Sequence, residues 1–238
     1  MKPKRNILLK TPLNSLPLFP LLILSTLIPG LAFAGKTEKS KINLFIEAVI
    51  AGNYDPFFIR WSNQLTTSSI NIEKTVKIRF PTGIAYGAIA SKILPRACSS
   101  VRSALHEPDG LLGVIAKVET LRNLKKISGS ASNFLLDLTI KVPVLSDFKT
   151  QARVRLYQDS KQREVLEWKQ VGQLGHLAYN RGFMIMESQG QTCKALVLGI
   201  HVIKDEHKIP WFGRATATSF TKTHYANYIK ALESIALK

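Results

Sequence analysis

Few residues of this 238-residue sequence stand at spacings that are typical of catalysis or metal binding. The chain has no Gly-x-Ser-x-Gly motif, no phosphate-cradling glycine loop, no His-Glu-x-x-His and no Cys-x-x-Cys. Its five histidines are scattered. His201 and His207 could approach each other beside Asp205 and Glu206, but such residues in a polar loop are more often solvated. We therefore expect neither a metal nor a cofactor.

The N-terminus has the three parts of a secretory signal peptide. Residues 1–10 are basic, residues 16–33 are apolar, and Ala32-Phe33-Ala34 fits a small-x-small cleavage site. We expect cleavage after Ala34 and export, to a bacterial periplasm or the medium. An uncleaved membrane anchor is the alternative, although the apolar block is short and interrupted by prolines.

The net charge of +17 points to anionic partners. Removal of residues 1–34 takes away four basic residues and no acidic one, which leaves +13. Phospholipid headgroups of a membrane surface, lipopolysaccharide or an acidic protein would fit this surplus. Nucleic acid is disfavoured because export removes most of that ligand. A solvated basic surface without a specific partner remains the alternative, and the sequence does not indicate the oligomeric state.

A long amphipathic helix is expected at the C-terminus, from Gly213 to Lys238. Its apolar residues Phe220, Tyr225 and Ile229 recur at helical spacing. Such a helix must bury its apolar face, and the large partner available is a sheet.

Seven strands are expected before that helix, because apolar and polar residues alternate in short segments separated by turns. The basic segment 118–127 is expected at a sheet edge, since lysines discourage further pairing. Short helices are expected at 97–105 and 111–116. Residues 35–81 contain a candidate helix (41–51) and a candidate strand (70–80), but the sequence does not place them in the fold. The strand segments are 84–94, 118–127, 134–142, 148–157, 163–171, 177–186 and 193–203.

This order of elements resembles the helix-grip fold of the START-like superfamily, which includes polyketide cyclase/dehydrase proteins and Bet v 1-like proteins. The resemblance rests on the strand IAYGAIASKIL followed by Pro95 and a short helix, on the strand run that begins VETLRNLKKISG, and on the closing helix. It implies an α+β fold in which a curved antiparallel sheet of about seven strands wraps around the C-terminal helix. The implied division is a signal peptide (1–34), an N-terminal extension (35–81) and a helix-grip domain (82–238).

The resemblance further implies an apolar cavity between sheet and helix that holds a hydrophobic small molecule or lipid. For segment 177–186 the inward pair is either Phe183 with Ile185 or Met184 with Met186. The competing interpretation is that the inward residues form a solid core. The expected ligand-binding residues are Leu136, Leu138, Ala152, Val154, Trp168, Phe183, Leu198 and Ile200 on strands, and Phe220, Tyr225 and Ile229 on the helix.

The same resemblance implies a disulfide between the two cysteines. In a helix-grip sheet the first and last strands are antiparallel neighbours, so Cys98 and Cys193 would lie side by side. Export would expose them to oxidising conditions. Two unpaired buried thiols are the alternative.

Three functions are compatible with these features. An exported binding protein for a hydrophobic small molecule or lipid is the first. A cyclase or aromatase using the same cavity would need a buried titratable group, for which Glu167, Arg181, Tyr179 and His201 are the candidates. A protein without a cavity, which binds an envelope polymer through its basic surface, is the third.

Overall fold

A computed structural model describes most of the chain after the expected signal peptide. The signal peptide itself, and His207 with Asp205 and Glu206, lie outside the described residues. The described ranges are 38–62, 70–80, 82–142, 147–172, 177–204 and 211–236.

The described residues form five helices and eight strands. All seven expected strands and the three expected helices after residue 82 are present, with ends shifted by a few residues. The bounds are α1 Glu38–Ala51, α2 Asp55–Ser62, β1 Asn71–Phe80, β2 Gly83–Leu94, α3 Cys98–His106, α4 Gly110–Ala116, β3 Leu121–Gly129, β4 Asn133–Ile140, β5 Phe148–Gln158, β6 Glu164–Gln170, β7 Leu177–Gln189, β8 Thr192–Ile203 and α5 Trp211–Ala236.

The strands make one antiparallel sheet in the order β1-β2-β8-β7-β6-β5-β4-β3. Strands β2 to β8 are the seven of the expected helix-grip arrangement, which is confirmed. The basic strand β3 is an edge of the sheet, as its lysines predict. Strand β1, which the sequence did not place, is the eighth strand and pairs with β2.

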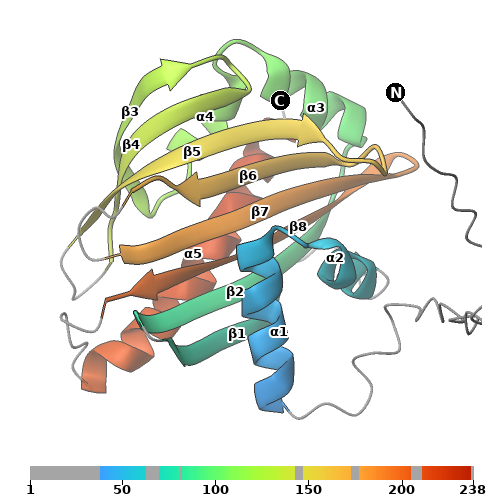
Figure 1. The fold of residues 1–238 in the computed structure, drawn as a ribbon. Coiled ribbons are helices and arrows are strands. Elements are labelled where there is room, and N and C mark those ends of the chain that lie inside the picture. Colours follow the sequence, from blue (N-terminus) through green and yellow to red (C-terminus); the bar gives the residue numbers. More distant parts are fainter. Residues whose placement is uncertain are drawn as a thin grey trace, which may run out of the picture.

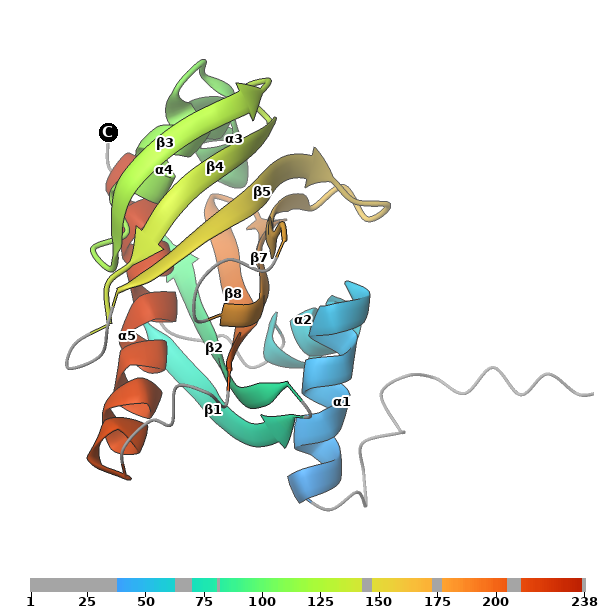
Figure 2. The same ribbon diagram turned by 60° about the vertical axis from the view of Figure 1, so that its left-hand side comes forward.

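The sheet lies between two helical layers (Figures 1 and 2). In Figure 2, α5 is on one side of the sheet, while α1 and α2 are on the other. Apolar residues of α3, α4 and α5 share one buried core with the concave face of the sheet. Apolar residues of α1 and α2 form a second core on the opposite face.

The second core corrects part of the expected ligand set. Phe183, Leu198 and Ile200 pack under α1 and α2, not against α5, so the expectation that they face the C-terminal helix is wrong. Met184 and Met186 are the residues of β7 that face the α5 side. Strands β7 and β8 are central and covered on both faces, so the pattern of their apolar residues does not show which side faces α5 and which faces α1 and α2.

Two arginines fasten α1 and α2 to the sheet. Arg163 is 3% exposed and forms ion pairs with Asp55 of α2 and with Asp159. Arg181 pairs with Glu167 and also donates a hydrogen bond to the carbonyl of Ile50 at the end of α1. Glu167 and Arg181, two of the catalytic candidates, are therefore paired with each other.

A row of small residues brings α5 close to the sheet. Gly182 pairs with Gly199, and Gly199 pairs with Ala88 on the next strand. A Cβ at Gly182 would stand 2.1 Å from the ring of Trp168, and one at Gly199 would stand 2.7 Å from the hydroxyl of Tyr225. The two rings therefore occupy space that any side chain at these positions would fill.

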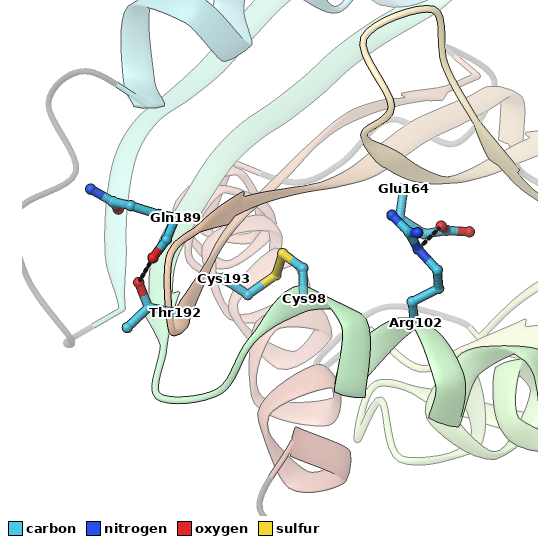
Figure 3. The surroundings of a disulfide bond; sticks show 6 residues. All are labelled: Cys98, Arg102, Glu164, Gln189, Thr192 and Cys193. Atoms are coloured by element: carbon cyan, nitrogen blue, oxygen red, sulfur yellow. Dashed lines mark hydrogen bonds and ion pairs between the residues drawn. A yellow bond between two sulfur atoms is a disulfide. The ribbon is translucent and has the colours of Figure 1, made fainter.

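A disulfide joins Cys98 at the start of α3 to Cys193 at the start of β8 (Figure 3). The pairing follows from the sheet, because β2 and β8 are antiparallel and Leu94 lies opposite Cys193. In the chain-entropy model, a disulfide that closes the loop from residue 98 to residue 193 stabilises the folded protein by on the order of 4–5 kcal/mol, less any strain. Close to it, Arg102 of α3 forms an ion pair with the buried Glu164.

The glycine row predicts a specific coupling between Gly182 and Trp168. We expect Gly182→Ala to lower the free energy of unfolding by about 1–3 kcal/mol, because the new methyl group overlaps the Trp168 ring. Trp168→Leu removes that ring, so the double variant should lose less stability than the sum of the single variants. Urea unfolding of the four proteins measures the coupling.

Gly113→Ala is the matched control. Gly113 lies in α4, and a methyl group added there would meet no other part of the described structure within 4 Å, so alanine should be neutral or stabilising. Strict additivity of Gly182→Ala and Trp168→Leu would contradict the account.

Candidate functional site

Five of the expected ligand-binding residues surround one apolar gap between the sheet and the helices. Its volume is about 10 Å³, which is room for one water molecule at most. The lining comprises the expected Leu136, Leu138, Ala152, Val154 and Trp168, together with Ile115, Leu121, Ile140, Leu166, Asn180 and Tyr228.

Aromatic stacking closes this gap on the α5 side. The rings of Trp168 and Tyr228 are parallel, with centroids 4.6 Å apart. The indole nitrogen of Trp168 donates a hydrogen bond of 3.3 Å to the side chain of Asn180. Both rings are buried and belong to the lining of the gap.

A larger groove lies beside the gap, between α5 and the loops that border β3 and β4. Its volume is about 560 Å³, within the range of small-molecule sites. The expected residue Phe220 is in its wall, whereas the other lining residues are mostly polar. They are Glu119, Thr120, Arg122, Lys141, Thr216, Ser219, Thr223 and Asn227.

On three segments of the chain, residues next to each other in the sequence line the groove and the gap. Thr120 lines the groove and Leu121 the gap; Lys141 and Ile140 divide in the same way, as do Asn227 and Tyr228. The groove therefore has a mostly polar lining and the gap a mostly apolar one, and Tyr228 of α5 lines the gap.

The remaining expected helix residues, Tyr225 and Ile229, point elsewhere. Tyr225 lies against Gly199, and the ring of His201 is parallel to it at 6.5 Å. Ile229 is fully buried in the same core. These two residues fix α5 to the sheet and line neither the groove nor the gap.

Two histidines are buried near the groove. The hydroxyl of Thr221 donates to the carbonyl of Ala217, so its oxygen accepts the Nε2–H of His201 at 3.2 Å. His224 shares a hydrogen bond of 2.6 Å between its Nδ1 and the hydroxyl of Thr120. Burial lowers the pKa of His201 to about 4. Burial and the neighbouring His201 lower the pKa of His224 to about 3. Both rings are therefore neutral at pH 7.

The catalytic candidates do not gather at this site. Glu167 and Arg181 pair with each other, and Tyr179 packs against the core under α1 and α2, on the opposite side of the sheet. His201 alone faces α5. Among the described residues there is no cluster of three or more His, Cys, Asp or Glu side chains that could hold a metal ion.

Sequence reasoning missed the polar part of the site. Asn227 lies seven residues after Phe220, on the same helical face, so a polar residue at an apolar position was the available signal. His224 lies between Phe220 and Asn227 on that face and is likewise a polar residue at an apolar position. Arg122 and Lys141 looked like ordinary charges of an edge strand and a strand end.

No helix in the described part of the chain is long and apolar enough to cross a membrane. No protein-family model matches the sequence. No curated protein matches it either.

Solved structures with a similar fold do exist. The Zhui aromatase/cyclase from Streptomyces sp. R1128 superposes with a TM-score of 0.50 at 10% identity, covering 64% of this chain and 94% of that one. A STAR-related lipid transfer protein fragment from Xanthomonas axonopodis gives 0.47 at 11% identity, covering 69% and 99%. Human StAR-related lipid transfer protein 5 gives 0.47 at 12% identity, covering 82% and 98%. With the strand order, the first of these likenesses shows that the chain has the helix-grip fold of START-like proteins.

The two buried histidines predict that the protein loses stability in acid already at pH values above those at which carboxylates titrate. Their pKa values in the folded protein are below the ordinary 6.5, so below pH 6.5 the unfolded chain binds protons that the folded chain does not. The free energy of unfolding should fall by about 2 kcal/mol per histidine between pH 7 and pH 5. His201→Gln and His224→Gln should each reduce this slope in urea unfolding.

Asp55→Asn serves as the control. Burial alone would raise the pKa of Asp55, but hydrogen bonds from Lys161 and Arg163 hold it below its ordinary 3.8. Its contribution is therefore lost only as the pH falls through about 4 and below, and the variant should keep the slope between pH 7 and pH 5. A flat wild-type profile in that window would refute the assignment.

Proposed function

We propose that the protein is an exported binding protein for a hydrophobic small molecule or lipid. The polar end of the ligand lies in the groove, and its apolar part enters the gap between the sheet and α5. The observation that carries this proposal is that three pairs of sequence neighbours, among them Asn227 and Tyr228, line the two spaces, with the polar residue of each pair on the groove and the apolar one on the gap.

Binding requires the gap to open. A space of about 10 Å³ holds no hydrocarbon chain, so Tyr228 must leave its stack on Trp168 when the ligand enters. The apolar ligand then replaces the contacts that the ring gives up, which limits the cost of the movement. Gly182 and Gly199 keep α5 on the sheet while this happens, since Tyr225 does not line the gap.

The cyclase alternative has less support. Of its four candidate residues, His201 alone faces the α5 side, and its Nε2–H is already donated to Thr221. It lines neither the groove nor the gap.

The basic-surface alternative has one specific observation in its favour. Lys149, Arg153 and Lys169 are exposed on the outer face of the sheet, and Arg153 lies directly opposite Lys169. Such a face suits an anionic membrane surface or envelope polymer. Binding through it would weaken steeply with salt and would not require an apolar ligand.

Variants of opposite size at the gap test the binding proposal. Leu138→Ala enlarges the gap and should strengthen binding of the fluorescent fatty acid cis-parinaric acid, whereas Ala152→Leu fills the gap and should weaken it. We expect the dissociation constant to change about tenfold, which corresponds to the gain or loss of one or two methyl-sized contacts. Fluorescence titration of the purified variants measures the affinities.

Leu198→Ala is the matched control, because Leu198 is also a buried leucine of the sheet but lies under α1 and α2. Like Leu138→Ala, it should destabilise the fold by about 2–5 kcal/mol, but it should leave the affinity for cis-parinaric acid unchanged. Identical affinities in Leu138→Ala, Ala152→Leu and wild type would exclude the gap as the binding space.

Export predicts a defined mature protein. The intact mass of protein purified from its own host should correspond to a chain that begins at Gly35, because cleavage is expected after Ala34. It should also be two hydrogens lighter than the reduced form, as the disulfide requires. A full-length chain with two free thiols would contradict both export and the oxidised state.

A further inference from the structure

A buried amide that lacks a hydrogen-bond partner among the described residues lies in the wall of the groove. The side chain of Asn227 is 1% exposed, and neither its nitrogen nor its oxygen has a hydrogen-bond partner in the described part of the chain. Each such unmade bond costs about 1–3 kcal/mol. Asn227 also lines the groove, so a bound molecule that reaches the amide can supply both a hydrogen-bond acceptor and a donor.

The charges around this amide favour an anion. Arg122 and Lys141 line the same groove, and neither has an acidic partner among the described residues. Glu119 is the one carboxylate in the lining, so two positive charges stand against one negative charge. Charge-assisted hydrogen bonds to a bound anion are about twice as strong as neutral ones.

We infer that the groove recognises a hydroxylated anionic head group, of which phosphoglycerol is the simplest chemical form. The Nδ2 group of Asn227 donates to an oxygen of the anion, and its Oδ1 accepts from a hydroxyl of the same head. Arg122 and Lys141 balance the negative charge, while Glu119 is available to accept from a further hydroxyl. A head without a hydroxyl satisfies only half of the amide, and a zwitterionic head without a hydroxyl also lacks the net negative charge that Arg122 and Lys141 would balance.

This assignment deepens the proposed function and rests on it for the orientation of the ligand. The head in the groove places an attached chain beside Phe220 and Tyr228, at the mouth of the apolar gap. Head recognition itself requires the groove alone, so it can be tested separately from chain binding.

Titration calorimetry with short-chain lipids below their micelle concentration tests the inference. We expect dihexanoyl-phosphatidylglycerol to bind at least about tenfold more tightly than dihexanoyl-phosphatidylcholine. sn-Glycerol 3-phosphate, titrated alone, separates the two sources of this chemistry. Binding as tight as that of the lipid identifies a free phosphoester as the ligand, and weaker binding identifies a lipid head. Both results support the groove, and equal affinity for the two lipids overturns it.

Variants assign the effect to the amide. Asn227→Leu removes a buried group that lacks partners within the described residues, so it should abolish the preference for phosphatidylglycerol without lowering the midpoint of urea unfolding. Lys141→Ala should reduce the preference, and Lys230→Ala, an exposed lysine of the same helix as Asn227 but outside the groove lining, should leave it intact. An undiminished preference in Asn227→Leu would refute the role of the amide.

Binding of cis-parinaric acid distinguishes the two proposals. If Asn227→Leu loses the lipid preference but keeps fatty-acid affinity, both stand. If the wild type binds sn-glycerol 3-phosphate but no fatty acid, head recognition stands and the apolar gap is not a binding space. If it binds fatty acid without any preference between the two lipids, the binding protein stands and the head-group assignment falls.

Discussion

Close contact between α5 and the sheet depends on the missing side chains of Gly182 and Gly199. These residues pair across β7 and β8, and the rings of Trp168 and Tyr225 occupy the space above them. The helix therefore packs directly on β2 and β8. The concave space that remains lies toward β3, β4, β5 and β6, where the gap and the groove are found. The glycine row thus decides which half of the fold is solid and which half can admit a ligand.

The second helical layer supports this division from the other side. Helices α1 and α2 pack on Phe183, Leu198 and Ile200 of the convex face. Arg163 binds α2 by an ion pair, and Arg181 binds α1 by a hydrogen bond. Apolar cores therefore cover both faces of the central strands, and the disulfide links the start of β8 covalently to α3. Among the described residues, no apolar side chain of β3 or β4 belongs to the core under α1 and α2, so movement that opens the gap is expected in that half.

Sequence reasoning predicted the elements well and their faces only in part. Alternation in segment 134–142 identified Leu136 and Leu138 correctly, because the outer face of β4 is partly polar. It failed for Leu198 and Ile200, because β8 is buried on both faces and carries apolar residues on each of them. Export, and with it the boundary at residue 34, stays a prediction. The groove escaped notice because Asn227, Arg122 and Lys141 come from distant segments that only the fold brings together.

A crystal structure of the protein with bound phosphatidylglycerol tests the central claim most directly. The account predicts a head group within hydrogen-bond distance of Asn227, an acyl chain among Leu136, Ala152 and Val154, Tyr228 displaced from Trp168, and Tyr225 still seated over Gly199. A chain bound on the convex face, or an α5 lifted from the glycine row to make room, would contradict it.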